Sequence, residues 1–75
     1  MNILELLKHI SSHVVQDYAL FKCSHEEYPD LVYKDGRLHY YLNDESHVDT
    51  LLELNTNDII YLISLNFTYS EVKLW

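Results

Sequence analysis

The sequence predicts an α+β fold in which one N-terminal amphipathic helix packs on an antiparallel, mostly meandering sheet of four or five strands. Apolar residues recur at helical spacing near the N-terminus, an Asp-Gly pair separates two apolar runs in the middle, and apolar residues alternate with polar ones toward the C-terminus. The 75 residues are enough for one small domain, so we expect residues 1–75 to fold as a single unit.

The N-terminal helix is expected over residues 3–17. Asn2 and Glu5 have the spacing of a capping box, in which each side chain accepts a hydrogen bond from the other residue's backbone amide. His9 falls on the side that we expect to face water. The opposite side carries apolar residues at steps of three and four, namely Ile3, Leu4, Leu7, Ile10, Val14 and Tyr18. This stripe predicts that the helix lies on the sheet.

The strongest local signal is a hairpin around Asp35 and Gly36. Both residues of a two-residue hairpin turn need a positive φ, which Asp and Gly tolerate. The turn predicts a register with Lys34 opposite Arg37, Tyr33 opposite Leu38 and Leu31 opposite Tyr40. We expect a core face with Leu31, Tyr33, Leu38, Tyr40 and Leu42, and a mostly wet face with Lys34, Arg37, Val32, His39 and Tyr41. A strand over residues 19–23 and a loop over residues 25–30, held open by Pro29, precede the hairpin.

Two further strands are predicted in the second half of the chain. Apolar residues hold the odd positions over residues 59–69, which is typical of a strand, and their parity changes near residues 70–71, where a bulge or a new element begins. Residues 44–54 fit either a helix with an acidic first turn or a strand. We favour the strand, because a loop over residues 55–58 then pairs Leu54 with Ile59, Leu52 with Tyr61, Thr50 with Ile63 and Val48 with Leu65.

Cysteine content and the N-terminus indicate a soluble protein. Cys23 is the single cysteine, so no intrachain disulfide can form. The first residues include Glu5 and lack the basic stretch of a secretory signal. No apolar run approaches the roughly 18 residues of a membrane span. We therefore expect a cytoplasmic protein, in the host cell if it is encoded by a phage, that does not bind membranes.

Acidic residues dominate the second half of the chain. The net charge of −7 divides into −2 for residues 1–37 and −5 for residues 38–75. Such a field favours a basic partner and repels nucleic acid and acidic ligands. Five Lys and Arg side chains cannot supply the several phosphate contacts that drive nucleic-acid binding. We expect no direct binding to nucleic acid.

No motif indicates a reaction, a metal or a cofactor. His9 and His13 have the spacing that can bring two imidazoles to one metal ion, but with Cys23 and His25 they form an incomplete set of ligands. Cys23 and His25 lack the third, orienting group of a thiol nucleophile. Gly36 is the single glycine, so a glycine-rich phosphate loop is excluded. We expect a protein that is not an enzyme and holds neither metal nor cofactor.

The sequence predicts instead an apolar surface for another protein. One helix of about 15 residues covers one face of a sheet, so large apolar side chains on the other face would remain in water. We expect that face to include Leu51, Ile60, Leu62, Val32 and Tyr41. A homodimer or a basic partner protein would cover it; alternatively, residues 72–75 fold over it.

Carboxylates are the second part of the predicted interface. We expect Asp44, Glu45, Asp49, Glu53 and Asp58 to bind a basic partner, with Glu26, Glu27 and Asp30 as a second cluster. Carboxylates on one strand face recur about every 6.5–7 Å, a spacing that can address the Lys and Arg side chains that normally hold phosphates.

In size, acidity, tyrosine content and lack of a catalytic motif, the chain resembles the small acidic proteins that phages and plasmids encode to block host nucleases, CRISPR effectors or restriction enzymes. The resemblance implies a DNA mimic, an anti-CRISPR or anti-restriction inhibitor that offers carboxylates in place of phosphates. The alternative is an antitoxin or immunity-type protein that neutralises a basic toxin by direct contact.

Overall fold

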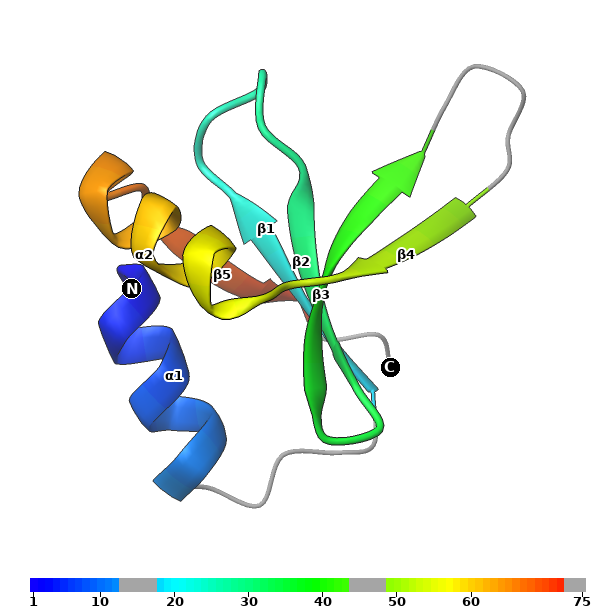
Figure 1. Ribbon diagram of the computed structural model, residues 1–75, viewed down its shortest axis with the longest axis horizontal. Coiled ribbons are helices and arrows are strands. Elements are labelled where there is room, and N and C mark those ends of the chain that lie inside the picture. Colours follow the sequence, from blue (N-terminus) through cyan, green and yellow to red (C-terminus); the bar gives the residue numbers. More distant parts are fainter. Residues whose placement is uncertain (13–17, 44–48, 73–75) are drawn as a thin grey trace.

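The computed structural model describes residues 1–12, 18–43 and 49–72, and it confirms the α+β class with a five-stranded antiparallel sheet (Figure 1). The sheet order is β4-β3-β2-β1-β5. Along the chain the elements are α1 (Ile3–Ser12), β1 (Tyr18–Cys23), β2 (Asp30–Lys34), β3 (Arg37–Asn43), β4 (Asp49–Glu53), α2 (Thr56–Leu65) and β5 (Tyr69–Val72). In the described part of the chain, neither helix has the length and apolar character needed to cross a membrane.

The hairpin of β2 and β3 has the predicted register. Lys34 pairs with Arg37, Tyr33 with Leu38, and Leu31 with Tyr40. The turn residues have the positive φ values that this hairpin demands, 54° at Asp35 and 76° at Gly36. The strand predicted over residues 19–23 is also confirmed, as β1, which pairs with β2 and β5.

Helix α1 begins with the predicted capping box. The Glu5 amide donates to Asn2 Oδ1 at 2.9 Å, and the Asn2 amide donates to Glu5 Oε1 at 3.0 Å. Residues 13–17 of the predicted helix lie outside the described residues. The position expected for His9 is wrong. Its ring is partly buried between α1 and the sheet, 3.0 Å from the Glu71 carboxylate and edge-on to Phe21.

The strand predicted over residues 59–69 is wrong, because most of this segment forms helix α2. The Asp58 amide donates to Asn55 Oδ1 at 2.8 Å, and the Asn55 amide donates to Asp58 Oδ2 at 3.0 Å. This capping box starts the helix, and Asn66, in a left-handed conformation with φ of 54°, ends it. A new element was expected near residues 70–71, and β5 begins close by, at Tyr69.

The strand interpretation of residues 44–54 is confirmed for β4, whereas residues 44–48 lie outside the described residues. The predicted pairing with residues 59–65 is wrong. Strand β4 pairs with β3, so that Leu52 lies opposite Tyr40 and Leu51 opposite Tyr41. The capping box of Asn55 and Asp58 starts a helix in this segment. The alternation of apolar residues does not oppose it, because a partly buried helix can carry the same pattern.

Both helices pack on the same face of the sheet, which we call the inner face. The buried residues there are Ile3, Leu6, Ala19, Phe21, Cys23, Leu31, Leu38, Leu54, Leu62 and Tyr69. Leu4, expected on the side of the N-terminal helix that faces the sheet, is 49% exposed. Two positions predicted for the hairpin also differ. Leu42, expected in the core, is 40% exposed because the helices do not reach the far end of β3. Val32, expected on a mostly wet face, is fully buried on the opposite, outer face.

Candidate protein-binding site

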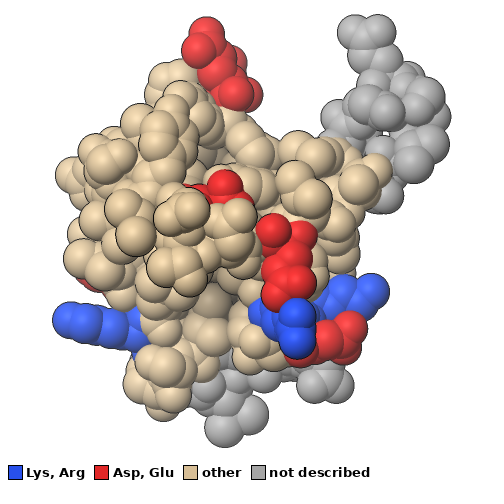
Figure 2. Space-filling view, viewed as in Figure 1, with Lys and Arg blue, Asp and Glu red and all other residues tan. Residues whose placement is uncertain are grey.

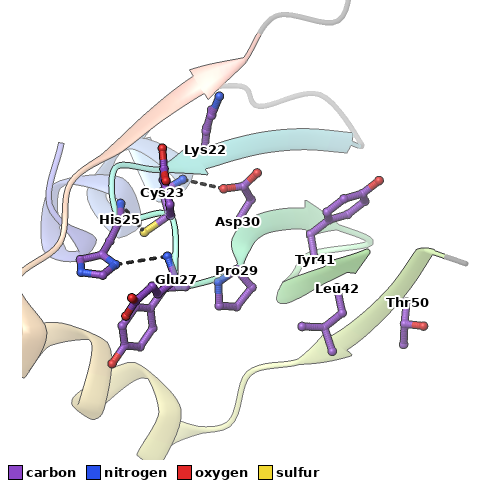
Figure 3. Close-up of a pocket in the computed structure, with 11 residues that line it drawn as sticks. Lys22, Cys23, His25, Glu27, Pro29, Asp30, Tyr41, Leu42 and Thr50 are labelled. Atoms are coloured by element: carbon purple, nitrogen blue, oxygen red, sulfur yellow. Dashed lines mark hydrogen bonds between the residues drawn. The ribbon is translucent and has the colours of Figure 1, made fainter. Parts of the chain in front are cut away.

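The described residues enclose an open groove of about 910 Å³ between the loop joining β1 to β2 and the ends of β3 and β4. Figure 3 shows the loop residues on one side of the groove and Tyr41, Leu42 and Thr50 on the other. The groove is lined by Lys22, Cys23, His25, Glu26, Glu27, Tyr28, Pro29, Asp30, Tyr41, Leu42 and Thr50. Glu26, Glu27 and Asp30 contribute three carboxylates to this lining and Lys22 contributes one ammonium group, so the groove carries more negative than positive charge.

Local hydrogen bonds hold the loop in shape. Asp30 Oδ1 accepts from the Cys23 amide at 2.8 Å, which joins the two ends of the loop. The Glu27 amide donates to His25 Nδ1 at 3.3 Å, and the Tyr28 amide donates to the His25 carbonyl at 3.1 Å. Since His25 Nδ1 accepts a hydrogen bond, the neutral ring carries its proton on Nε2.

Aromatic rings attach this loop to the segment that follows α2. The His25 and Tyr28 ring centroids lie 4.9 and 4.6 Å from that of Phe67, and 5.3 Å from each other. Ser24 adds two hydrogen bonds to Thr68: its amide donates to the Thr68 carbonyl at 2.9 Å and its hydroxyl accepts from the Thr68 amide at 3.3 Å. The groove wall is therefore preformed, which reduces the entropy lost on binding.

Beside the groove, the inner face carries a surface that we name the tyrosine–leucine patch, made of Tyr28, Tyr40, Leu42, Leu52 and Tyr61. The phenol groups of Tyr28 and Tyr61 lie close enough to interact, Tyr40 lies near Tyr61, and Leu52 pairs with Tyr40 across the strands. Leu52 is 55% exposed and Tyr61 52% exposed. Large aromatic and aliphatic side chains in this state are typical of a contact surface for another protein.

The phenol groups of the patch are electrostatically perturbed. The pKa of Tyr28 is raised, first by its hydrogen bond with Tyr61. The pKa of Tyr40 is raised by burial and by the nearby Asp58 carboxylate. Both hydroxyls are protonated at neutral pH, as an ordinary tyrosine is, and can donate hydrogen bonds to a bound partner.

The predicted carboxylates do not form one array. Asp44 and Glu45 lie outside the described residues, and Asp49 begins β4. Three others have local partners. Glu53 pairs with Arg37 at 2.8 Å, Asp58 caps α2 and Asp30 accepts from the Cys23 amide.

Glu26 and Glu27 are exposed in the β1–β2 loop, and their carboxylates form no ion pair with other described residues. Figure 2 shows acidic side chains at the top and centre of this side of the molecule, and both basic and acidic side chains along its lower part. The carboxylates at the top have no Lys or Arg side chain beside them in this view.

The apolar residues predicted for one sheet face are also dispersed. Leu62 is 3% exposed in the core side of α2, so its predicted place in an interface is wrong, and Ile60 on the same helix is 58% exposed. Val32 is buried and cannot contact a partner. Tyr41 lines the groove, and Leu51 is partly exposed on β4. Residues 59–65 belong to a helix and not to the predicted strand. Ile60 and Leu62 are therefore separated from Leu51, which lies on β4.

Metal ligands do not gather in the part of the chain that the structure describes: no group of three His, Cys, Asp or Glu side chains could hold an ion there. Cys23 is buried, and its sulfur accepts from the His25 backbone amide at 3.5 Å. His13 lies outside the described residues.

Sequence reasoning missed the tyrosine–leucine patch. Tyr40 and Leu42 were assigned to the core, and Tyr61 to a strand. The signal that could have placed Tyr61 was the Asn55–Asp58 capping box, which predicts a helix and turns Tyr61 away from Ile59 and Ile63.

Comparison of the chain with protein-family models, with curated proteins and with solved structures found no match.

Proposed function

We propose that this protein binds a basic surface of a second protein through the tyrosine–leucine patch and the acidic groove beside it, and thereby inhibits that protein. The observation that carries the proposal is the continuity of the two surfaces. Tyr28 and Leu42 belong to both. The patch residues Leu52 and Tyr61, each with about half of its surface in water, therefore lie on a surface continuous with exposed carboxylates.

The chemistry of this surface selects a basic partner. Burial of Leu52 and Tyr61 would supply affinity through removal of apolar area from water. Glu26 and Glu27 would attract Lys and Arg side chains, which speeds association and gives specificity. Proteins that bind nucleic acid carry such side chains in the surface that holds phosphates. Occupation of that surface would block nucleic acid, which is the form of inhibition that we propose.

Affinity capture with the immobilised protein tests this function. We expect extract of the source organism to yield retained proteins that are basic and that excess duplex DNA displaces. Leu52→Ser and the double variant Glu26→Gln/Glu27→Gln should each lose them. Leu4→Ser is the matched control, because Leu4 is 49% exposed on α1 and is not a residue of the patch.

Retention that is equal for the wild type and for both patch variants would contradict the proposal. Retention that duplex DNA does not affect would contradict the inhibition of nucleic-acid binding, because partner and DNA would then use different surfaces.

A further inference from the structure

The two edges of the sheet differ. At the β5 edge, the Met1 amino group donates to the Tyr69 carbonyl at 2.8 Å, the Tyr69 amide donates to the Met1 carbonyl at 2.6 Å, and Asn2 forms a bridge with Thr68. The opposite edge is β4, and within the described residues no strand pairs with its outer side. An unpaired edge strand is a template for another extended chain.

The register shows which backbone groups of β4 face outward. The Leu54 amide donates to the Leu38 carbonyl at 2.9 Å, across the ladder to β3. Hydrogen-bonding residues alternate along an antiparallel strand, so the amides of residues 50 and 52 also face β3. The N–H and C=O groups of Leu51 and Glu53 therefore face the open edge.

We infer that the open edge of β4 binds an extended basic segment of the partner protein as an added strand. This inference rests on the proposed function and names the form in which the partner is recognised. The outward N–H and C=O groups of Leu51 and Glu53 would hold the segment, as in other cases of strand addition.

Side-chain alternation assigns the two faces of the added strand. On the inner face, its side chains would lie beside Leu52, at the border of the tyrosine–leucine patch, so apolar side chains fit there. On the outer face, they would lie beside Glu53, so Lys or Arg fits. A segment that alternates basic and apolar residues therefore satisfies both faces.

Glu53 is available for such a segment. Its pair with Arg37 spans 2.8 Å, but the two side chains are 48% and 65% exposed. Exposed ion pairs contribute little to stability. An incoming Lys or Arg can therefore share the Glu53 carboxylate with Arg37, or replace Arg37 there, with little loss of stability.

Charge disfavours a second copy of this chain as the occupant. Two β4 strands aligned antiparallel over their full length would place Glu53 of each copy opposite Asp49 of the other. Like charges directly opposite each other destabilise strand pairing, and each chain also carries a net charge of −7.

The test uses an octapeptide of alternating lysine and valine as the probe, added to the ¹⁵N-labelled protein. We expect peptide-dependent NMR shifts and slower hydrogen exchange at the Leu51 and Glu53 amides. An octapeptide of alternating glutamate and valine should cause neither, because the edge would repel it. Equal shifts with both peptides would overturn the charge argument, and faster or unchanged exchange at these two amides would overturn the strand addition.

Leu51→Pro separates edge pairing from general attraction. Proline is tolerated in an edge strand where the lost N–H faces outward, so the fold should persist. Loss of one backbone hydrogen bond should weaken lysine–valine peptide binding roughly two- to tenfold. Leu51→Ala is the control for the lost side chain and should bind more tightly than Leu51→Pro.

Glu53→Lys tests the same strand edge through its charge and does not depend on whether the proline variant folds. It should weaken binding of the lysine–valine peptide and permit binding of the glutamate–valine peptide. If the peptides do not bind, or bind all variants alike, while affinity capture still depends on Leu52 and Glu26/Glu27, the edge inference fails and the proposed function stands.

Discussion

Asn55 and Asp58 cap the start of α2 reciprocally, each side chain accepting a hydrogen bond from the other residue's amide, at 2.8 and 3.0 Å. This pair determines where the helix begins and so presents Tyr61 to the patch and Leu62 to the core.

Asn55→Ala should lower the free energy of unfolding by about 0.5–2 kcal/mol, because it leaves an amide of the first helical turn without its acceptor. Urea denaturation followed by circular dichroism measures the change. Asn57→Ala is the matched control within the first turn, since Asn57 is exposed and lies outside the capping pair. Equal losses for both variants would contradict the capping role.

Gly36→Val should destabilise the hairpin by about 1–3 kcal/mol, because a β-branched residue would be held at φ of 76°. An added Cβ would have no atom within 4 Å, so the cost comes from the backbone conformation and not from a clash. Gly36→Asn should cost less, since Asn tolerates the left-handed region. Thermal melts rank the three proteins, and a wild-type melting temperature for the valine variant would refute the explanation.

Leu62→Glu should unfold the protein, whereas Ile60→Glu on the same helix should leave it folded. Leu62 is 3% exposed within the core and Ile60 is 58% exposed, so only the first change buries a carboxylate without a partner. Circular dichroism and amide NMR spectra distinguish the two outcomes. A folded Leu62→Glu variant would show that α2 does not pack as described.

Stability should fall as the pH rises above about 10, the pKa of tyrosine in an unfolded chain. Burial, together with the neighbouring Cys23 thiol, raises the pKa of Tyr69 well above that value. Below pH 10 both states are protonated. Above it the unfolded chain loses a proton that folded Tyr69 keeps, which favours unfolding.

Absorbance of phenolate near 295 nm follows this titration. In the folded protein part of the signal should be delayed to higher pH, and the delay should vanish in urea. Tyr69→Phe should reduce both the delayed signal and the alkaline loss of stability. An unchanged pH dependence in this variant would contradict the assignment to Tyr69.

Local chemistry predicted much of the fold. The Asn2–Glu5 capping box, the Asp35-Gly36 turn and the register of β2 with β3 each depend on neighbouring residues, and all three are confirmed. The alternation over residues 59–69 misled, because apolar residues on several sides of a short helix can also occupy alternate positions. The capping pair at its start was the better signal, since it satisfies amides that only a helix leaves open.

The sequence by itself determined the α+β class, the hairpin and the net charge. Tertiary structure decided which carboxylates have local partners and which apolar side chains remain in water. Arg37 reaches Glu53 only because β3 and β4 pair. Tyr28 meets Tyr61 only because α2 returns to the β1–β2 loop. Such contacts between residues distant in the chain leave no local pattern, because burial depends on which elements pack together.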